Sequence, residues 1–435
     1  MLIETNVEVN LRSIEEFTRV MVSELLEDKI NFEILKENDL IKIKVKSEKL
    51  NKNTEFSYID LGNKIEDQIL TMCKISLLKL LDKKYDWGSL MGVRPTKVLR
   101  RLLINGCDYK EARKILKNFY LVTDEKINLM ETVVKKELEL LDKEHINLYI
   151  GIPFCPTKCK YCSFASYEIN GGVGRFYNDF VEALLKEIQI VGDFLKTYSK
   201  KVSSIYFGGG TPSTLTEEDL ERVLKKLLEN IDMSDVKEFT FEAGREDSLN
   251  AQKLGIMKKY SVDRISLNPQ SFNLKTLKRV NRRFNRENFD LIFKEAKKLE
   301  FIINMDLIIG LPEETTEDIL NTLSQLKDYD IDNLTIHCLA FKRASKLFKE
   351  SQERNSIDRA LIEKHIQKIV EEKAMKPYYM YRQKNIIEWG ENIGYSKEGK
   401  ESIFNIEMIE ENQNTMALGG GGISKIVIEE RNGID

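Results

Sequence analysis

Residues 148–162 read Leu148-Tyr-Ile-Gly-Ile-Pro-Phe-Cys-Pro-Thr-Lys-Cys-Lys-Tyr-Cys162, an apolar strand that runs directly into a loop with three cysteines. Three thiolates in one short loop can ligate three irons of a [4Fe–4S] cluster and leave the fourth iron open, because soft sulfur ligands suit such clusters. A structural zinc site takes four ligands, and the loop offers no fourth Cys or His. Zinc, or three unrelated buried thiols, is therefore the less favoured interpretation of Cys155, Cys159 and Cys162.

From residue 147 onward, short apolar strands alternate with amphipathic helices. We expect strands at Leu148–Ile152, Ser204–Phe207, Glu238–Glu242, Arg264–Leu267, Ile302–Ile308 and Leu334–Ala340. Between them we expect helices that include Phe176–Lys196, Thr216–Asn230, Glu287–Leu299 and Thr316–Leu326. Strand–helix alternation is typical of parallel strands joined by crossover helices. The pattern predicts the α/β class, with an open, partial (β/α)6 barrel that is two units short of a full one.

The flanking regions lack this strand–helix alternation, so we expect three parts: an N-terminal α+β region at 1–145, the barrel at 146–340 and a small C-terminal α+β domain at 341–435. In the first part, β-type patterns cover Leu2–Val9 and Leu40–Val45. Helical spacing of apolar residues covers Ser13–Leu26, Lys64–Leu81, Thr96–Leu103 and Thr123–Glu144.

Composition excludes several classes of protein. The chain has 435 residues, 42% hydrophobic and 32% charged, which is typical of a folded globular protein. Its net charge of −3 argues against nucleic acid as a partner. Six cysteines are too few for a disulfide scaffold of this size. With no secretory signal and no apolar run long enough to span a membrane, the chain is expected to be cytoplasmic.

The cysteine loop carries a family resemblance. Tyr149–Cys162 resembles the cluster loop of radical S-adenosylmethionine (SAM) enzymes, and within them that of the oxygen-independent coproporphyrinogen III oxidase family, HemZ-type coproporphyrinogen dehydrogenase branch. The resemblance covers about residues 145–425, and it implies that the C-terminal part caps the barrel mouth. It implies a [4Fe–4S] cluster held by Cys155, Cys159 and Cys162, with SAM as the second cofactor.

A second motif, Gly208-Gly-Gly-Thr-Pro212, ends the second predicted strand. Three glycines leave the backbone without side chains, so a ligand can approach it closely and accept N–H hydrogen bonds. Taken alone, the triplet is equally well explained as a flexible turn. The resemblance implies that Gly209, Gly210 and Thr211 contact the amino group of SAM.

Polar residues lie at or just beyond the carboxyl ends of the later strands, where a barrel has its active face. They are Glu242, Gln270, Arg282 and Asp306. Each one alone would be explained as a capping or ion-pair residue, but together they resemble the family's SAM contacts. The resemblance adds Ala340 as a backbone contact to adenine and Tyr149 as a contact from the first strand, where core packing is the alternative.

Other positions leave two interpretations open. Arg282, Arg283 and Arg286 form either a solvated helix end or a site for substrate propionates, since guanidinium groups match carboxylates. Tyr379 and Tyr381 lie on one face of a strand, which either packs a flat macrocycle or belongs to the β-core.

The sequence departs from the family pattern in three places. Phe164 stands where other members have a further cysteine, and Gly151 stands where many have histidine. The acidic segment reads Glu242-Ala-Gly-Arg-Glu246, without the usual proline.

The resemblance implies radical chemistry on a tetrapyrrole, namely oxidative decarboxylation of coproporphyrinogen III to protoporphyrinogen IX. It also implies an electron donor such as flavodoxin or ferredoxin, and we expect a monomer. Two alternatives share the same SAM-binding residues: a haem-binding or haem-transfer protein, and an anaerobic haem-modifying radical SAM enzyme.

Overall fold

A computed structural model describes residues 2–59, 61, 65–142, 144–340, 342, 344–349, 356–383 and 390–427. The described residues form two compact units, one within residues 1–134 and the other within residues 135–429, which we describe separately. The boundaries expected from sequence, after residues 145 and 340, remain predictions.

The first unit is built on a four-stranded sheet in the order β1-β2-β3-β4, formed by β1 (Leu2–Thr5), β2 (Lys29–Glu37), β3 (Leu40–Ser47) and β4 (Lys52–Ile59). β1 pairs parallel with β2, and the other pairs are antiparallel. Ile41, Ile43 and Val45 of β3 are buried, whereas the lysines between them face outward. This alternation is typical of a sheet with one face on the core and one face in solvent.

Helices complete this unit. They are α1 (Leu11–Met21), α2 (Ile65–Leu80), α3 (Thr96–Ile104), α4 (Tyr109–Asn118) and α5 (Asp124–Leu140), the last of which extends past Val134. The helices expected from sequence are all present, with ends shifted by a few residues. β2 and β4 lie outside the predicted strands, although buried Ile30, Phe32 and Ile34 give β2 the same alternation as β3.

The second unit contains a nine-stranded sheet in the order β13-β14-β12-β11-β10-β9-β8-β5-β15. Its six central strands are β5 (Ile146–Ile152), β8 (Val202–Gly209), β9 (Glu238–Glu242), β10 (Arg264–Ser266), β11 (Ile302–Ile309) and β12 (Asn333–Cys338). They pair in parallel with one another and follow one another in chain order. The predicted α/β class with six parallel strands is confirmed, and the sheet of the described residues stays open.

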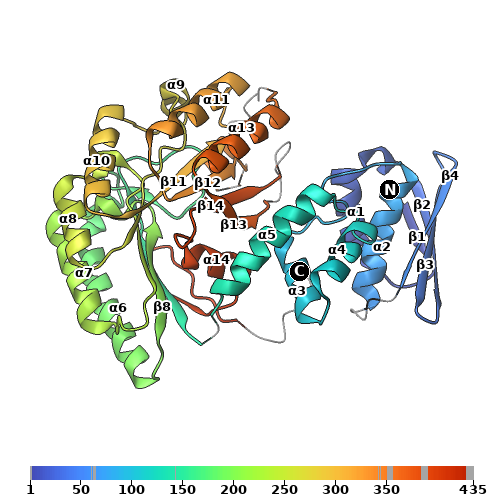
Figure 1. The fold of residues 1–435 in the computed structure, drawn as a ribbon, viewed down its shortest axis with the longest axis horizontal. Helices are drawn as coiled ribbons and strands as arrows, with labels where there is room; N and C mark the ends of the chain where they lie inside the picture. Colours follow the sequence, from blue (N-terminus) through green and yellow to red (C-terminus); the bar gives the residue numbers. More distant parts are fainter. Residues whose placement is uncertain are drawn as a thin grey trace. The chain divides into compact units, whose positions relative to one another are not determined.

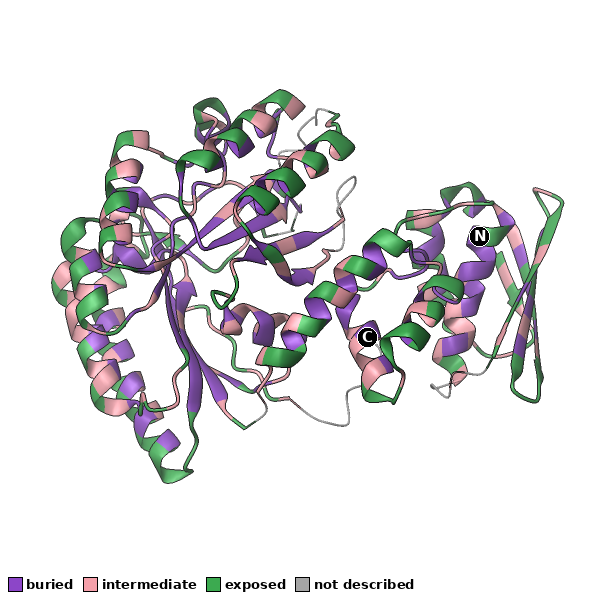
Figure 2. Ribbon diagram, viewed as in Figure 1, coloured by how far each residue is buried: buried purple, intermediate pink, exposed green. Residues whose placement is uncertain are grey.

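Crossover helices cover one face of this sheet (Figure 1). They are α6 (Tyr177–Thr197), α7 (Glu217–Asn230), α8 (Ala251–Lys259), α10 (Arg286–Lys298) and α11 (Thr316–Gln325). Helices α7, α8, α10 and α11 begin with polar N-caps: Thr216, Asn250, Asn285 and Thr315 accept a hydrogen bond from a backbone N–H of the first turn. Between helices and sheet lies a continuous apolar core, which Figure 2 shows as nearly unbroken burial along the parallel strands.

The C-terminal region extends the same sheet at both edges. It contributes α13 (Arg359–Glu372), β13 (Lys376–Tyr381), β14 (Asn392–Ser396), α14 (Ile403–Glu410) and β15 (Thr415–Gly419). β14 pairs antiparallel with β12, and β15 pairs parallel with β5. Phe404 of α14 stacks on Tyr149 and Tyr206, so this helix packs against the sheet face that carries those two tyrosines.

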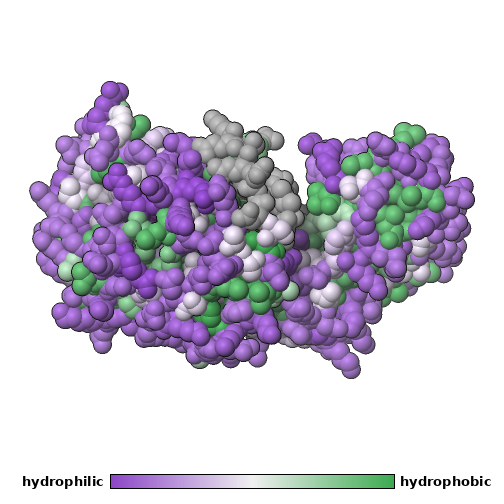
Figure 3. All heavy atoms as spheres, turned by 90° about the horizontal axis from the view of Figure 1, so that it is seen from above, coloured by the Kyte–Doolittle hydropathy of each residue, from purple (hydrophilic) through white to green (hydrophobic). Residues whose placement is uncertain are grey.

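In the space-filling view most of the surface is hydrophilic, interrupted by small hydrophobic patches (Figure 3). None of the helices in the described part of the chain is both long and apolar enough to cross a membrane.

Candidate active site

A cavity of about 420 Å³ lies at the carboxyl ends of the parallel strands. Every residue predicted for the site lines it, except Tyr149. Those that do are Cys155, Cys159, Cys162, Gly209, Gly210, Thr211, Glu242, Gln270, Arg282, Asp306 and Ala340. These side chains come from separate strands and meet because parallel strands all end at one edge of the sheet.

The cysteine loop is folded back by short-range hydrogen bonds. The strands β6 (Phe154–Cys155) and β7 (Tyr167–Glu168) pair across it, and the Ile169 N–H donates to the Cys155 carbonyl at 2.9 Å. Lys158 Nζ donates to the carbonyl groups of Phe164 and Ser166, at 3.2 and 2.8 Å. A charged side chain thus closes the loop around the three thiols.

The three cysteines are free thiols on one wall of the cavity. Thr211 Oγ1 donates to Cys155 Sγ at 3.4 Å, and Ser166 Oγ lies 3.9 Å from Cys162 Sγ. Burial raises the pKa of the Cys155 and Cys162 thiols. In the described residues no three His, Cys, Asp or Glu side chains are already gathered closely enough to hold a single metal ion. Three sulfur donors along one wall fit a cluster that bridges several irons better than one small ion.

The glycine segment packs tightly against the strand that leads into this loop. A Cβ at Gly210 would lie 2.5 Å from the Phe154 carbonyl oxygen, and Gly209 has φ of +102°. The N–H groups of Gly210 and Thr211 already donate to the Ile152 and Phe154 carbonyls. The expectation that these N–H groups are offered to a ligand is therefore wrong. The glycines serve close backbone packing, and a ligand amino group here would need carbonyl acceptors.

Glu242 is the best-defined acid in the cavity. The Tyr206 hydroxyl donates to Glu242 Oε1, and the two side chains come from adjacent strands, β8 and β9. Burial, together with the nearby Asp306 charge, raises the pKa of Glu242 to about 7, although the Tyr206 hydrogen bond opposes this. A carboxyl group with such a pKa binds the hydroxyl groups of a ligand in either protonation state.

Asp306 has the opposite electrostatic environment. Burial opposes its charge, but His337, Asn304 and Thr335 outweigh that effect, and the pKa of Asp306 is lowered. Asn304 Nδ2 donates to Asp306 Oδ1 at 2.9 Å, and His337 Nε2 lies 3.7 Å from Oδ2. The carboxylate that interrupts the apolar run of β11 is therefore compensated by protein partners.

Three polar atoms of the described cavity wall are shielded from solvent and lack a hydrogen-bond partner. They are Gln270 Oε1, Arg282 Nε and Gln383 Oε1. Gln270 also has φ of +67°, an unusual conformation for a residue with a side chain. Buried polar atoms without partners are costly, and strained backbone concentrates at functional sites. Both observations fit a polar ligand that supplies the missing hydrogen bonds.

The remaining predicted positions are divided between cavity and scaffold. Tyr149 stacks on Tyr206, with ring centroids 6.2 Å apart, and does not line the cavity. Arg286 pairs with Asp290 of its own helix and lies over the Phe272 ring, so it belongs to the scaffold.

Tyr379 and Tyr381 both line the cavity. Tyr379 forms a hydrogen bond with Thr335 at 3.2 Å, and the Tyr381 hydroxyl lies 3.3 Å from His337 Nδ1. The face of β13 that they share is thus a cavity wall, although Tyr379 is itself nearly fully buried.

Sequence reasoning missed several lining residues, notably Tyr206, Arg245, Asn268 and His337. Tyr206 and His337 lie on strands, where alternation could have assigned them to the face shared with Glu242 and Asp306. Arg245 and Asn268 follow strands directly, which is the signal that singled out Gln270.

The departure at Gly151 has a steric cause. A Cβ at this position would lie 2.4 Å from the Gly420 carbonyl oxygen, because β15 and the glycine-rich segment behind it pack against β5. A histidine cannot occupy this position in the present backbone.

Comparison with known proteins agrees with this geometry. Residues 149–326 match the radical SAM superfamily model. The oxygen-independent coproporphyrinogen-III oxidase-like protein HemZ of Bacillus subtilis is 40% identical over 78% of this chain and 70% of its own. The chain belongs to this radical SAM family. Its cofactors are a [4Fe–4S] cluster and SAM, and the donor set and the unpaired polar atoms of the cavity fit both.

Other relatives match a smaller share of the chain. The heme chaperone HemW of Bacillus subtilis is 32% identical over 44% of this chain and 49% of its own. The anaerobilin synthase of Escherichia coli O157:H7 is 30% identical over 48% of each chain. The match thus spans about half the length of each of these relatives. The solved structure of Escherichia coli coproporphyrinogen III oxidase, HemN, is 20% identical with a TM-score of 0.53 over 67% of both chains, which supports the fold.

Proposed function

We propose that this protein catalyses the oxygen-independent oxidative decarboxylation of coproporphyrinogen III to protoporphyrinogen IX. The observation that carries the proposal is the composition of the cavity. Three thiols, polar strand-end residues with unpaired atoms, and aromatic and apolar side chains all line it. The HemZ relative of Bacillus subtilis, described as coproporphyrinogen-III oxidase-like, supports the choice of substrate.

Cys155, Cys159 and Cys162 would hold the cluster, and the strand-end residues would hold SAM. When bound, these groups supply the one-electron cleavage that yields a hydrogen-abstracting carbon radical. The residues that we assign to SAM are Tyr149, Gly209, Gly210, Thr211, Glu242, Gln270, Arg282, Asp306 and Ala340. Unpaired Gln270 Oε1 and Arg282 Nε offer an acceptor and a donor to its polar groups. Tyr149 would act from beneath Gly209, since its hydroxyl lies 3.4 Å from a Cβ placed there.

The substrate would lie against the wall formed by β13 and α14. Tyr379 and Tyr381 face the cavity there, together with Met408 and Ile409 of α14. Flat aromatic rings and flexible apolar side chains suit a large macrocycle, whose own rings can pack against them. Burial raises the pKa of Tyr381 to about 12, so its phenol stays protonated and can donate to a propionate carboxylate.

The proposed reaction balances as follows. Each of two propionate side chains loses one hydrogen atom from its β-carbon, one CO2 and one electron, and becomes a vinyl group. The hydrogen atom ends in 5′-deoxyadenosine, and the electron passes to a one-electron acceptor. For each vinyl group one SAM is consumed, with one electron from a donor such as flavodoxin or ferredoxin. We propose a cytoplasmic monomer for this role.

The test is an anaerobic reaction of the cluster-reconstituted full chain with SAM, a reductant and coproporphyrinogen III, followed by mass spectrometry. We expect protoporphyrinogen IX and two equivalents of 5′-deoxyadenosine. 5′-Deoxyadenosine without a decarboxylated porphyrin would overturn the assignment of the substrate. Stoichiometric binding of haem with neither product would favour a role like that of the HemW relatives.

A further inference from the structure

Arg245 is a buried cation beside the cysteine loop to which none of the arguments above gives a role. It follows β9, in the segment where the sequence departs from the family pattern, and is 3% exposed. A buried guanidinium group must be paired to be tolerated. The guanidinium group of Arg245 forms hydrogen bonds on two sides, through different nitrogen atoms.

On one side, the guanidinium group forms a salt bridge with Asp247. Arg245 Nε donates to Asp247 Oδ1 at 2.9 Å, and Nη2 donates to Oδ2 at 2.6 Å. This two-point contact fixes the plane of the guanidinium group, which is the geometry that distinguishes arginine from lysine. The pairing also offsets most of the arginine charge.

The other side points into the cysteine loop. Arg245 Nη1 donates to the Thr157 carbonyl at 3.1 Å and to Thr157 Oγ1 at 2.9 Å, and it lies 3.9 Å from Cys159 Sγ. Arg245 thus joins the β9 loop to the middle of the cysteine loop. Of the three cysteines, it contacts the central one.

We propose that Arg245 is a positioning residue that holds the cysteine loop in its binding conformation and raises the reduction potential of the cluster through its N–H···S contact with Cys159. Hydrogen bonds to the sulfur ligands stabilise the reduced cluster, which carries more negative charge. Side chains that orient a metal ligand typically contribute about 10- to 100-fold to metal affinity. The proposal requires the cluster but not the tetrapyrrole.

The proposal predicts that loss of Arg245 and loss of Asp247 shift the midpoint potential of the cluster in opposite directions. Loss of Arg245 removes both the N–H donor and a positive charge, so the midpoint potential of the cluster should become more negative. Loss of the Asp247 charge leaves the guanidinium uncompensated, so the potential should become less negative. A purely structural salt bridge predicts that both variants damage the loop in the same way, with no opposite shift.

The experiment is a redox titration of the reconstituted full chain, followed by electron paramagnetic resonance, without SAM or porphyrin. We expect Arg245→Gln to shift the potential down and Asp247→Asn to shift it up. Arg245→Gln should also lose iron to a chelator about 10-fold faster than the unmodified chain. Arg264→Gln is the matched control, because Arg264 is an equally buried arginine that pairs with Glu238, not with the loop.

Equal potentials in Arg245→Gln and the unmodified chain would overturn the proposed tuning, and equal rates of iron loss would overturn the positioning role. If Arg245→Gln does not fold, iron loss from Thr157→Val tests the positioning role, and the potential of Asp247→Asn tests the tuning. Thr157→Val removes the hydroxyl that accepts from Arg245 and donates to the Asn281 carbonyl, but keeps the Thr157 carbonyl contact, so it should speed iron loss by a smaller factor. Since no tetrapyrrole is present, failure here is separate from failure of the proposed decarboxylation.

Discussion

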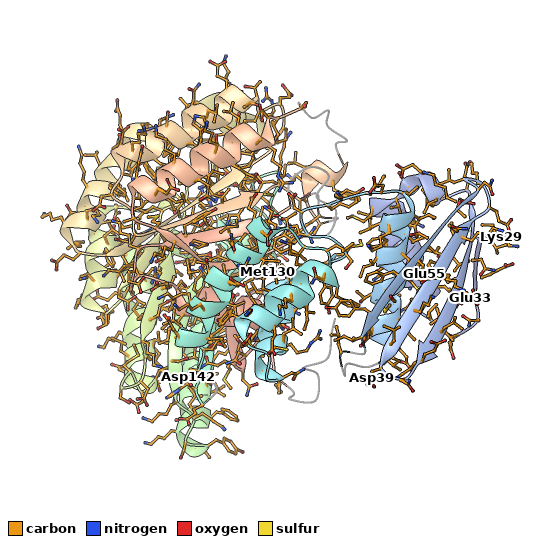
Figure 4. All side chains as sticks on the ribbon, turned by 45° about the vertical axis from the view of Figure 1, so that its right-hand side comes forward. Lys29, Glu33, Asp39, Glu55, Met130 and Asp142 are labelled. Atoms are coloured by element: carbon orange, nitrogen blue, oxygen red, sulfur yellow. The ribbon has the colours of Figure 1, made fainter. Side chains whose placement is uncertain are left out.

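The two sheets of this protein use their strands differently. Strands β2 and β3 of the first unit alternate between buried apolar residues and exposed charged ones, and Figure 4 labels Lys29, Glu33 and Glu55 on this sheet. Strands β5, β8 and β9 of the second unit are buried along almost their whole length. The first pattern is typical of a sheet with one solvated face, the second of parallel strands covered on both faces.

This difference determines where polar side chains can gather into a functional site. In the first sheet, polar side chains spread over a face and neutralise one another in surface pairs. In the second sheet, the strand bodies are apolar, so polar groups collect where the strands end, and parallel pairing brings all these ends together. Substitutions should therefore affect chemistry in the second unit and only stability in the first.

The largest effect is expected at the cysteine loop. Cys155→Ala, Cys159→Ala or Cys162→Ala should each abolish the cleavage of SAM, because two thiolates do not hold the cluster with an open iron. The measurement is 5′-deoxyadenosine formed per chain under reducing, anaerobic conditions. Cys73→Ala is the control, since this buried thiol lies in the first unit and should leave the yield unchanged. Full SAM cleavage by a variant without a cluster would contradict the account.

Glu242→Gln should weaken SAM binding about 10- to 100-fold, since a hydrogen bond to a charged group contributes about 1.5–3 kcal/mol. It should also change the pH dependence of stability. The pKa of Glu242 is raised from 4.5 to about 7, so the folded chain loses stability as pH rises through this window. The glutamine variant lacks this loss, and its stability relative to the unmodified chain should increase from pH 4.5 to 7. Chemical denaturation across this range checks the sign, and a relative decrease would contradict it.

Gly88→Ala should lower the stability of the first unit without changing SAM cleavage. Gly88 has φ of +52°, and a Cβ would lie 2.0 Å from the Tyr120 carbonyl oxygen. Strain and clash together predict a loss of about 3 kcal/mol. Gly106→Ala is the matched control, because Gly106 also has positive φ but nothing within 4 Å. Thermal unfolding should show a larger loss of stability for Gly88→Ala than for Gly106→Ala. Equal losses would show that the clash with the Tyr120 carbonyl oxygen contributes nothing.

The smallest effect is expected on the solvated face of the first sheet. Lys42 pairs with Glu55 at 2.8 Å, and both side chains are substantially exposed. Such pairs contribute about 0–1 kcal/mol, and less at high salt. Lys42→Gln should therefore change the free energy of unfolding by no more than about 0.5 kcal/mol. A loss above about 2 kcal/mol would show that this face is not simply solvated.

Local patterns account for most of what the sequence predicts correctly. The strand Glu238–Glu242 has the predicted ends, and helices α6, α7, α10 and α11 match within about a residue. Apolar spacing marks all four helices, and polar N-caps mark the last three. The positions of Glu242, Gln270, Arg282 and Asp306 near the strand ends could also be read from local patterns. That these residues line one cavity follows because parallel strands end at the same edge of the sheet.

Long-range pairing accounts for what the sequence does not show. No local pattern places β15 beside β5, nor Phe404 of α14 on Tyr149. The hydrogen bonds that occupy the N–H groups of Gly210 and Thr211 come from residues more than 50 positions away. The contact of Arg245 with Cys159 likewise joins two loops that are distant in sequence.

The most direct test of the account follows the hydrogen atom. Coproporphyrinogen III deuterated at the propionate β-carbons is incubated anaerobically with the reconstituted chain, SAM and a reductant, and the 5′-deoxyadenosine is analysed by mass spectrometry. The account predicts one deuterium in each 5′-deoxyadenosine and one vinyl group for each molecule formed. 5′-Deoxyadenosine without deuterium, together with unchanged coproporphyrinogen, would contradict it.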